Sequence, residues 1–190
     1  MSEPFRLRYA QQRTFSAHHM PLRAARIGLD EAERHEPGEL YRCLTSITFS
    51  AVGTEALVNA VSSRIDPDWL KRERDPTELK LEWLVGALGL QRNPQSEPWS
   101  TVTWLLRVRN DIAHAKPELI ESSRVITQQH YDAACFEMPE AKLERELTLG
   151  NARRAVAAAE SLKDMLCSAV PVNQRLGLFV DGSSHSIARE

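Results

Sequence analysis

The strongest pattern in the chain is an apolar stripe between residues 39 and 65. Its members recur at alternating steps of three and four: Leu40, Leu44, Ile47, Ala51, Thr54, Val58, Val61 and Ile65. This spacing gives a helix one apolar face. Because Pro37-Gly38 precedes the stripe and Asp66-Pro67 follows it, we expect a helix from about Glu39 to Ile65.

Other segments predict further helices. Residues 5–34 are rich in Arg, Ala and Leu and predict a helix in two pieces, interrupted by Pro21. A helix over about 76–88 has Asp75 as its N-cap and Gly89 at its end.

After a polar loop, Pro98 opens a helix from about Trp99 to His114, and Lys116-Pro117 ends it. Residues 118–138 read as irregular, and a last long helix is expected over about 139–170. Its apolar side is predicted to comprise Leu147, Ala155, Ala158, Leu162, Met165 and Leu166.

These elements predict an all-α fold, an antiparallel helical bundle of four to five core helices. We expect an N-terminal helical extension over residues 1–36, the bundle over 37–170 and a C-terminal tail over 171–190. Whether the residues before 38 belong to the bundle stays open. The apolar patch over 176–180 either docks on the bundle or frays.

Composition narrows the class of protein. Of the 190 residues, 42% are hydrophobic and 26% are charged, which suits one compact domain. The N-terminal residues resemble no secretory signal, and apolar stretches such as 81–90 are too short to span a bilayer. Three scattered cysteines (Cys43, Cys135 and Cys167) predict neither a disulfide framework nor a zinc knuckle. We therefore expect a cytoplasmic protein that contacts no membrane.

Charge is uneven along the chain. A net charge of −2 argues against a protein that coats nucleic acid by bulk electrostatics. Residues 1–29 nevertheless hold five arginines against Glu3 alone: Arg6, Arg8, Arg13, Arg23 and Arg26. This basic segment is either an arm that contacts a polyanion or the solvated face of a helix.

The chemically informative motif lies on the predicted helix over 99–114, at Arg109-Asn110-Asp111-Ile112-Ala113-His114. Arg109 falls inside the apolar arc of this helix, so it needs a carboxylate partner, a cleft or a subunit interface. Arg109 and His114 lie about 140° apart on an ideal helix. They converge on one ligand only if the arginine reaches round or if two copies of the helix face each other.

The Arg-Asn-x-x-x-His spacing resembles the active-site pattern of the HEPN (higher eukaryotes and prokaryotes nucleotide-binding) superfamily. The helix containing Glu55-Ala56-Leu57-Val58-Asn59 and the helix after residue 139 resemble other core helices of that family, so the likeness covers roughly residues 38–170. It implies a homodimer of helical bundles whose two motifs line one composite cleft and cut RNA without a metal or cofactor.

The resemblance also implies residue roles. His114 acts as general acid or base, Arg109 stabilises the phosphate and Asn110 orients it, with Glu55 holding Arg109 and Lys116 adding a phosphate contact. Family members include toxins and effectors of defence or stress, so an antitoxin or regulatory protein is a further candidate partner. Toxins silenced by nucleotidyltransferases carry a tyrosine where this chain has Lys116. Silencing at that position is therefore not expected.

Each of these functional interpretations has a structural or non-catalytic alternative. Arg109 and His114 are alternatively structural, and the chain is then a non-catalytic helical module that binds a partner protein or a nucleotide. His18, His19 and His35 lack carboxylates at ligand spacing, so no metal site is expected. The four tryptophans (Trp69, Trp83, Trp99 and Trp104) either stack bases or, more commonly, anchor the core.

Overall fold

The computed structural model of the chain describes residues 7–35, 37–123, 125, 127–129, 138–179 and 182–189. Most of them are helical. The elements in chain order are β1 (Leu7–Thr14), α1 (His19–Arg34), α2 (Glu39–Ile65), α3 (Trp69–Arg72), α4 (Thr77–Ala87), α5 (Trp99–Ala113), α7 (Lys142–Glu146), α8 (Leu149–Ala169), a 3-10 turn (Val172–Gln174) and β2 (Gly182–Arg189).

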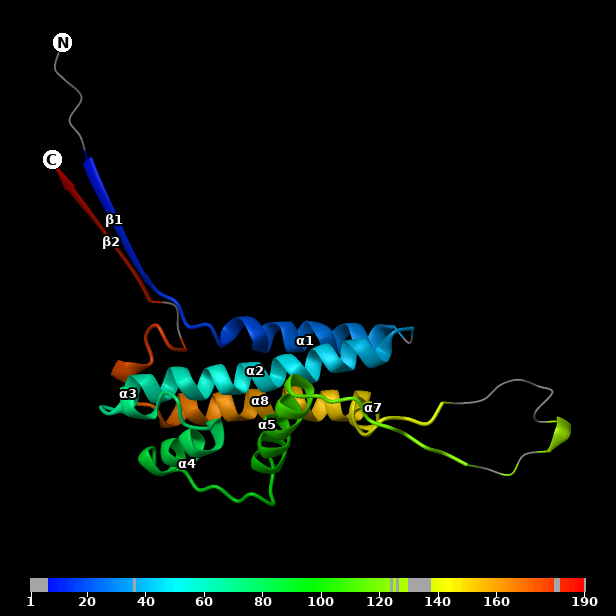
Figure 1. Ribbon diagram of the computed structural model, residues 1–190. Helices are drawn as coiled ribbons and strands as arrows, with labels where there is room; N and C mark the ends of the chain where they lie inside the picture. The colour runs from blue at the N-terminus through cyan, green and yellow to red at the C-terminus, as the bar shows by residue number, and fades with distance from the viewer. Residues whose placement is uncertain are drawn as a thin grey trace, which may run out of the picture.

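The bundle is built around α2, which packs against α1, α8, α5 and α4. Figure 1 shows that α2 and α8 run in the same direction and that α1 runs opposite to both. The predicted helical bundle is therefore present, but its central pair is parallel rather than antiparallel.

Burial explains why α2 is central. Its predicted apolar stripe supplies fully buried residues to two adjoining core clusters, with Ile47 and Ala51 in one and Val58 and Val61 in the other. In the predicted last helix, Ala155, Ala158, Leu162 and Leu166 are buried as expected, together with Leu147 just before α8. Met165 is only partly buried.

Two glycines allow α1 to approach α2 closely. A Cβ added at Gly53 would lie 2.6 Å from Leu22 Cδ2, and one added at Gly28 would lie 3.1 Å from the backbone nitrogen of Ser46. Ala25 and Leu29 of α1 share a core cluster with Ile47 of α2. Helix α1 is therefore a member of the bundle, which answers the question that the sequence leaves open about residues before 38.

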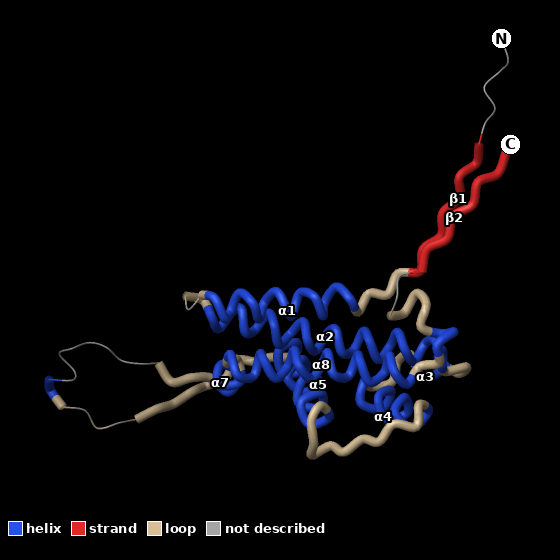
Figure 2. The backbone as a smooth tube through the Cα atoms, turned by 180° about the vertical axis from the view of Figure 1, so that it is seen from behind, coloured by secondary structure: helices blue, strands red, loops and turns tan. Residues whose placement is uncertain are grey.

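The prediction of an all-α fold is wrong at the two ends of the chain. Strand β1 pairs with β2 in an antiparallel two-stranded sheet, with Leu7 opposite Arg189 and Thr14 opposite Gly182. This ribbon extends away from the bundle (Figures 1 and 2). Residues 5–34 were expected to be helical, but the helix begins only at His19. Pro21 does not break it, because a proline in the first turn removes no intrahelical hydrogen bond.

Two further predicted helices differ from expectation in their boundaries. The predicted helix over 139–170 is split into α7 and α8, because the Thr148 side chain accepts a hydrogen bond from the Asn151 backbone N–H (3.2 Å) and caps a new helix. Helix α4 has Pro76 rather than Asp75 at its N-cap position, with no side-chain cap. Gly89 has the expected left-handed conformation after α4, with φ +65°.

The remaining segments are only partly described. Residues 118–123, 125, 127 and 138 form neither helix nor strand, as predicted, but 128 and 129 are helical, and 124, 126 and 130–137 lie outside the described residues. In the C-terminal tail, Leu178 is buried in the core and Phe179 packs against it, whereas Leu176 is exposed, so the patch over 176–180 docks on the bundle through residues 178 and 179.

Helix α2 is the one described helix that is long and apolar enough to cross a membrane. Half of its apolar window is buried inside the protein, where it packs against α1, α4, α5 and α8. A central core helix of this kind meets the same criteria of length and composition, so we read α2 as the core of the bundle.

Candidate functional site

The motif lies at the end of α5. Val102, Leu105 and Val108 are buried against the core, and they fix the rotation of this helix. The helix ends as expected near His114, whose backbone N–H donates to the Asn110 carbonyl (3.0 Å). Asn110, His114 and Lys116 are exposed, while Arg109 is partly buried.

Arg109 forms the ion pair that the sequence predicts. Its Nη2 lies 2.6 Å from Glu55 Oε2, and its Nη1 donates to Asn110 Oδ1 (2.8 Å). Thr77 Oγ1 donates to the other carboxylate oxygen of Glu55 (3.1 Å). The guanidinium is therefore held by residues of α2 and α5, and a hydroxyl from α4 orients the carboxylate.

The side chains of this pair are neither buried nor fully solvated. The Arg109 side chain is 36% exposed and that of Glu55 is 24% exposed. Both line a cleft of about 300 Å³, called the Arg109 cleft, whose walls are Glu55, Asp75, Pro76, Thr77, Glu78, Leu106, Arg109 and Asn110. Asp75 and Glu78 belong to the same lining as Glu55, so the cleft contains three acidic residues and one arginine.

His114 lines a second, larger hollow beside the first. This His114 groove, of about 700 Å³, is formed by the end of α5, the following segment and α7; its lining comprises Val108, Asn110, Asp111, His114, Ala115, Lys116, Glu118, Ile120, Ala141, Lys142, Leu143 and Glu146. Asn110 lines both hollows. Within one chain, the structure therefore unites Arg109, Asn110 and Glu55, while His114 and Lys116 lie in the adjoining groove.

The wall of the His114 groove is held by polar contacts to α7. Glu146 accepts hydrogen bonds from Trp104 Nε1 (2.6 Å) and Arg107 Nη2 (3.2 Å). Lys142 Nζ lies 3.7 Å from Asp111 Oδ2. The contacts of Glu146 keep α7 against α5, so the groove beside His114 exists without a ligand.

Sequence reasoning missed three residues of the Arg109 cleft, namely Asp75, Thr77 and Glu78. The signal for them was the Asp-Pro-Thr-Glu run before α4, which reads as an ordinary helix start. Only the packing of α4 beside α5 turns that helix start into a wall of the cleft.

His18, His19, His35 and the four tryptophans line neither the Arg109 cleft nor the His114 groove. Among the described residues, no three His, Cys, Asp or Glu side chains are grouped to hold a metal. Trp99 is buried and the other three tryptophans are partly buried, with Arg72, Lys80 and Arg154 lying over them. Burial raises the pKa of the Cys43 thiol, with Glu39 adding to the shift, and Cys135 lies outside the described residues.

Comparisons with models of known protein families, with curated proteins and with solved structures found no match for this chain. The resemblance to the HEPN superfamily therefore remains a prediction from the motif and from the order of the helices.

Proposed function

We propose that this chain is a metal-independent endoribonuclease of the HEPN type, acting as a homodimer with a composite Arg/His site. The observation that carries the proposal is the placement of Asn110. It bonds to Arg109 in one hollow and also lines the groove of His114, so the three motif residues form one accessible edge of α5.

The chemistry needs only these side chains. His114 removes the proton of an RNA 2′-hydroxyl, and the resulting oxygen attacks the adjacent phosphorus. Arg109 stabilises the negative charge that grows on the phosphate oxygens, and Asn110 orients the phosphate. The P–O5′ bond breaks and the leaving oxygen takes a proton. The products are a 2′,3′-cyclic phosphate and a 5′-hydroxyl.

A second copy is needed because Arg109 and His114 open into different hollows of one chain. The outer face of α2 offers a surface for it: Tyr41, Phe49 and Val52 are 70%, 39% and 39% exposed. Val52 lies three residues before Glu55 and therefore beside it on the helix surface. A two-fold contact over this face brings the Arg109 clefts of two chains towards each other.

A non-catalytic module that binds a partner protein or a nucleotide is the alternative, and one observation favours it. Arg109 is already engaged by Glu55 and Asn110, and the carboxylates of Asp75 and Glu78 line the same cleft. A phosphate reaches Arg109 only if the guanidinium turns from Glu55 towards the His114 groove.

The proposed activity belongs in the cytoplasm, where RNA is the available substrate. The core position of α2 agrees with a protein that is not embedded in a membrane. A toxin or an effector of defence or stress is the corresponding role, with an antitoxin or regulatory protein as partner. Lys116, exposed beside His114, is proposed to add a phosphate contact.

The test is cleavage of a mixed RNA substrate by the purified chain with EDTA present. We expect wild type to leave 2′,3′-cyclic phosphate ends, and we expect His114→Ala and Arg109→Ala to lose at least 100-fold in rate (roughly the contribution of general acid–base catalysis). His35→Ala, at an exposed histidine outside both hollows, is the matched control. Equal cleavage by wild type and His114→Ala would exclude the assignment.

A further inference from the structure

A basic segment near the N-terminus takes no part in the proposed active site. Residues 7–29 contain Arg8, Arg13, Arg23 and Arg26 but no Asp or Glu. Arg26 is paired with Glu160 of α8. Arg8, Arg13 and Arg23 lie on the exposed surface of β1 and α1, with the Arg13 guanidinium 5.7 Å from the Phe15 ring centroid, so the basic segment is not the solvated face of a single helix.

One face of the β1–β2 ribbon leads to the bundle. Side chains alternate along a strand, so Tyr9, Gln11 and Arg13 share a face. Tyr9 and the opposite Ile187 are 57% and 64% exposed. Tyr9 and Arg13 are about 13 Å apart along the strand. Because Arg13 also lines the pocket at the base of the ribbon, this face continues into that pocket.

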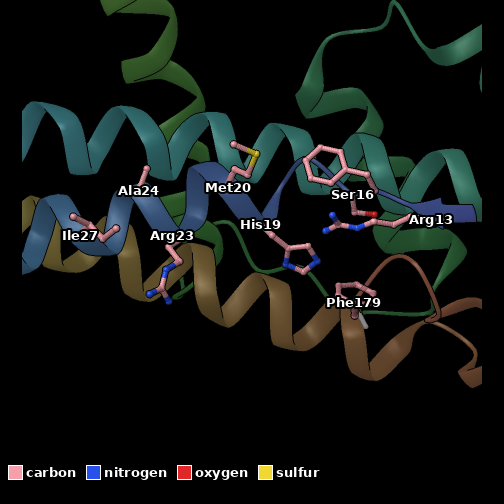
Figure 3. A pocket seen from close by; sticks show the side chains of 9 residues that line it. Arg13, Ser16, His19, Met20, Arg23, Ala24, Ile27 and Phe179 are labelled. Atoms are coloured by element: carbon pink, nitrogen blue, oxygen red, sulfur yellow. The ribbon is translucent and has the colours of Figure 1, made fainter. Parts of the chain in front are cut away.

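The pocket at the base of the ribbon has a volume of about 620 Å³, within the range of ligand sites. Its walls come from the end of β1, from α1 and from the tail: Arg13, Phe15, Ser16, His19, Met20, Arg23, Ala24, Ile27 and Phe179 (Figure 3). Phe15, Met20 and Ile27 are more than half exposed. The lining combines apolar and aromatic surface with two guanidinium groups, and no carboxylate of a described residue belongs to it.

Contacts between the two ends of the chain hold this pocket in shape. Ser16 Oγ donates to the Gly177 carbonyl (2.6 Å), and His19 Nε2 lies 3.0 Å from the Leu178 carbonyl oxygen. Leu178 is itself buried in the core. These contacts hold the backbone around the pocket without a ligand, which lowers the cost of ordering it on binding.

We propose that this pocket and the adjoining ribbon face bind single-stranded RNA, a proposal that rests on the proposed ribonuclease function. An unpaired base enters the pocket against Phe15 and Met20, and the backbone phosphates meet Arg13 and Arg23. Aromatic surface interleaved with cations is the chemistry that proteins use for single strands, since every base offers a π-face. The start of α1, which has no acidic residue in its first turn, adds positive potential at the same end.

The position of the pocket along α2 can be compared with that of the Arg109 cleft. Leu22, on the same helix as the pocket, lies against Gly53, two residues before Glu55 on α2. The pocket and the Arg109 cleft are thus level along the α2 axis. Gly53 and Glu55 are about 200° apart around α2, so the pocket and the cleft lie on opposite sides of this helix, and a strand bound at both passes around the bundle.

The test is fluorescence anisotropy of the full chain with a fluorescein-labelled 2′-O-methyl uridine 12-mer, measured across salt concentrations. The methyl group removes the attacking hydroxyl, so binding is measured without cleavage. We expect Arg13→Gln/Arg23→Gln to weaken binding at least tenfold at low salt and to reduce the salt slope by about 1.4 (roughly 0.7 per phosphate contact on single strands). Lys71→Gln/Arg74→Gln, which removes the same charge from exposed positions elsewhere, should bind like wild type.

A second variant separates stacking from charge. Phe15→Ala should weaken binding at least about fivefold with an unchanged salt slope, because it removes a ring that stacks on a base. Phe15 is 59% exposed, so the change leaves the core intact, which circular dichroism checks. Absence of binding by wild type, equal losses in the two double variants, or an unaffected Phe15→Ala would each overturn the proposal.

The outcome is distinguishable from failure of the proposed function. If His114→Ala binds the 12-mer like wild type while neither protein cuts RNA, the binding site stands and the nuclease assignment fails. If wild type cuts RNA and Arg13→Gln/Arg23→Gln cuts it at the same rate and concentration dependence, the nuclease stands and the binding site fails.

Discussion

His18 makes the stability of the fold depend on pH in a way that can be calculated. It is fully buried just before α1, its ring centroid is 4.0 Å from that of His19, and Phe179 lies edge-on to it. Neither ring nitrogen has a hydrogen-bond partner among the described residues. Burial, reinforced by the nearby positive charges of His19 and Lys163, lowers the pKa of His18 from 6.5 to about 4.

The sign follows from comparing the folded and unfolded states. Below pH 6.5 the unfolded chain takes up a proton at His18, whereas the folded chain takes it up only near pH 4. The free energy of unfolding contributed by neutral His18 is therefore complete above pH 6.5 and is lost as the pH falls to about 4. The full difference is about 3 kcal/mol, of which about 2 kcal/mol is lost by pH 5.

Urea unfolding between pH 7.5 and 5 tests this value with His18→Leu, a change of similar volume that removes the titrating group. We expect wild type to lose about 2 kcal/mol more than the variant over this range. At pH 7.5 the variant should equal or exceed wild type in stability, because it removes unpartnered buried polar atoms. His35→Leu, at an exposed histidine, should behave as wild type. If wild type and His18→Leu lost the same stability on acidification, the reasoning about His18 would be refuted.

Three further changes test packing and assembly. Gly53→Ala places a Cβ against Leu22 and should lower stability by about 1–3 kcal/mol, seen as a lower thermal midpoint, whereas Gly86→Ala, with open space around it, should not. Trp104→Phe removes the hydrogen bond to Glu146 and should cost about 1–2 kcal/mol in urea unfolding; an unchanged midpoint would mean that this bond does not hold α7. Val52→Asp should give monomers in sedimentation and abolish RNA cleavage, and a dimer that survives the charge would exclude the α2 face as the interface.

The helices were predictable where local signals agree. An apolar stripe bounded by Pro37-Gly38 and Asp66-Pro67 fixed the limits of α2 at Glu39 and Ile65, and the boundaries of α5 lie within one residue of expectation. Strand β1 was not predictable in this way. Its sequence, rich in Arg, Ala and Gln, suits a helix, and its partner lies about 170 residues further along the chain. No local sequence pattern indicates a pairing between strands so far apart in the chain.

The candidate site, like the fold, was predictable only in part. The position of Arg109 inside the apolar arc of a helix called for a carboxylate, a cleft or an interface, and the resemblance to the HEPN superfamily pointed to Glu55, which is its partner in the structure. The division into two hollows was not visible, because it depends on how α4 and α7 pack on opposite sides of α5.

The separation of Arg109 and His114 into two hollows also limits the chemistry that the motif can carry out. In one chain, Arg109 is held by Glu55 while His114 lines the adjoining groove, so the two groups do not meet at one phosphate in this arrangement. We propose that a second protomer, docked on the exposed face of α2 next to Glu55, changes this arrangement. Catalysis and association are therefore one hypothesis for this protein, and a stable monomer that cuts RNA would contradict both at once.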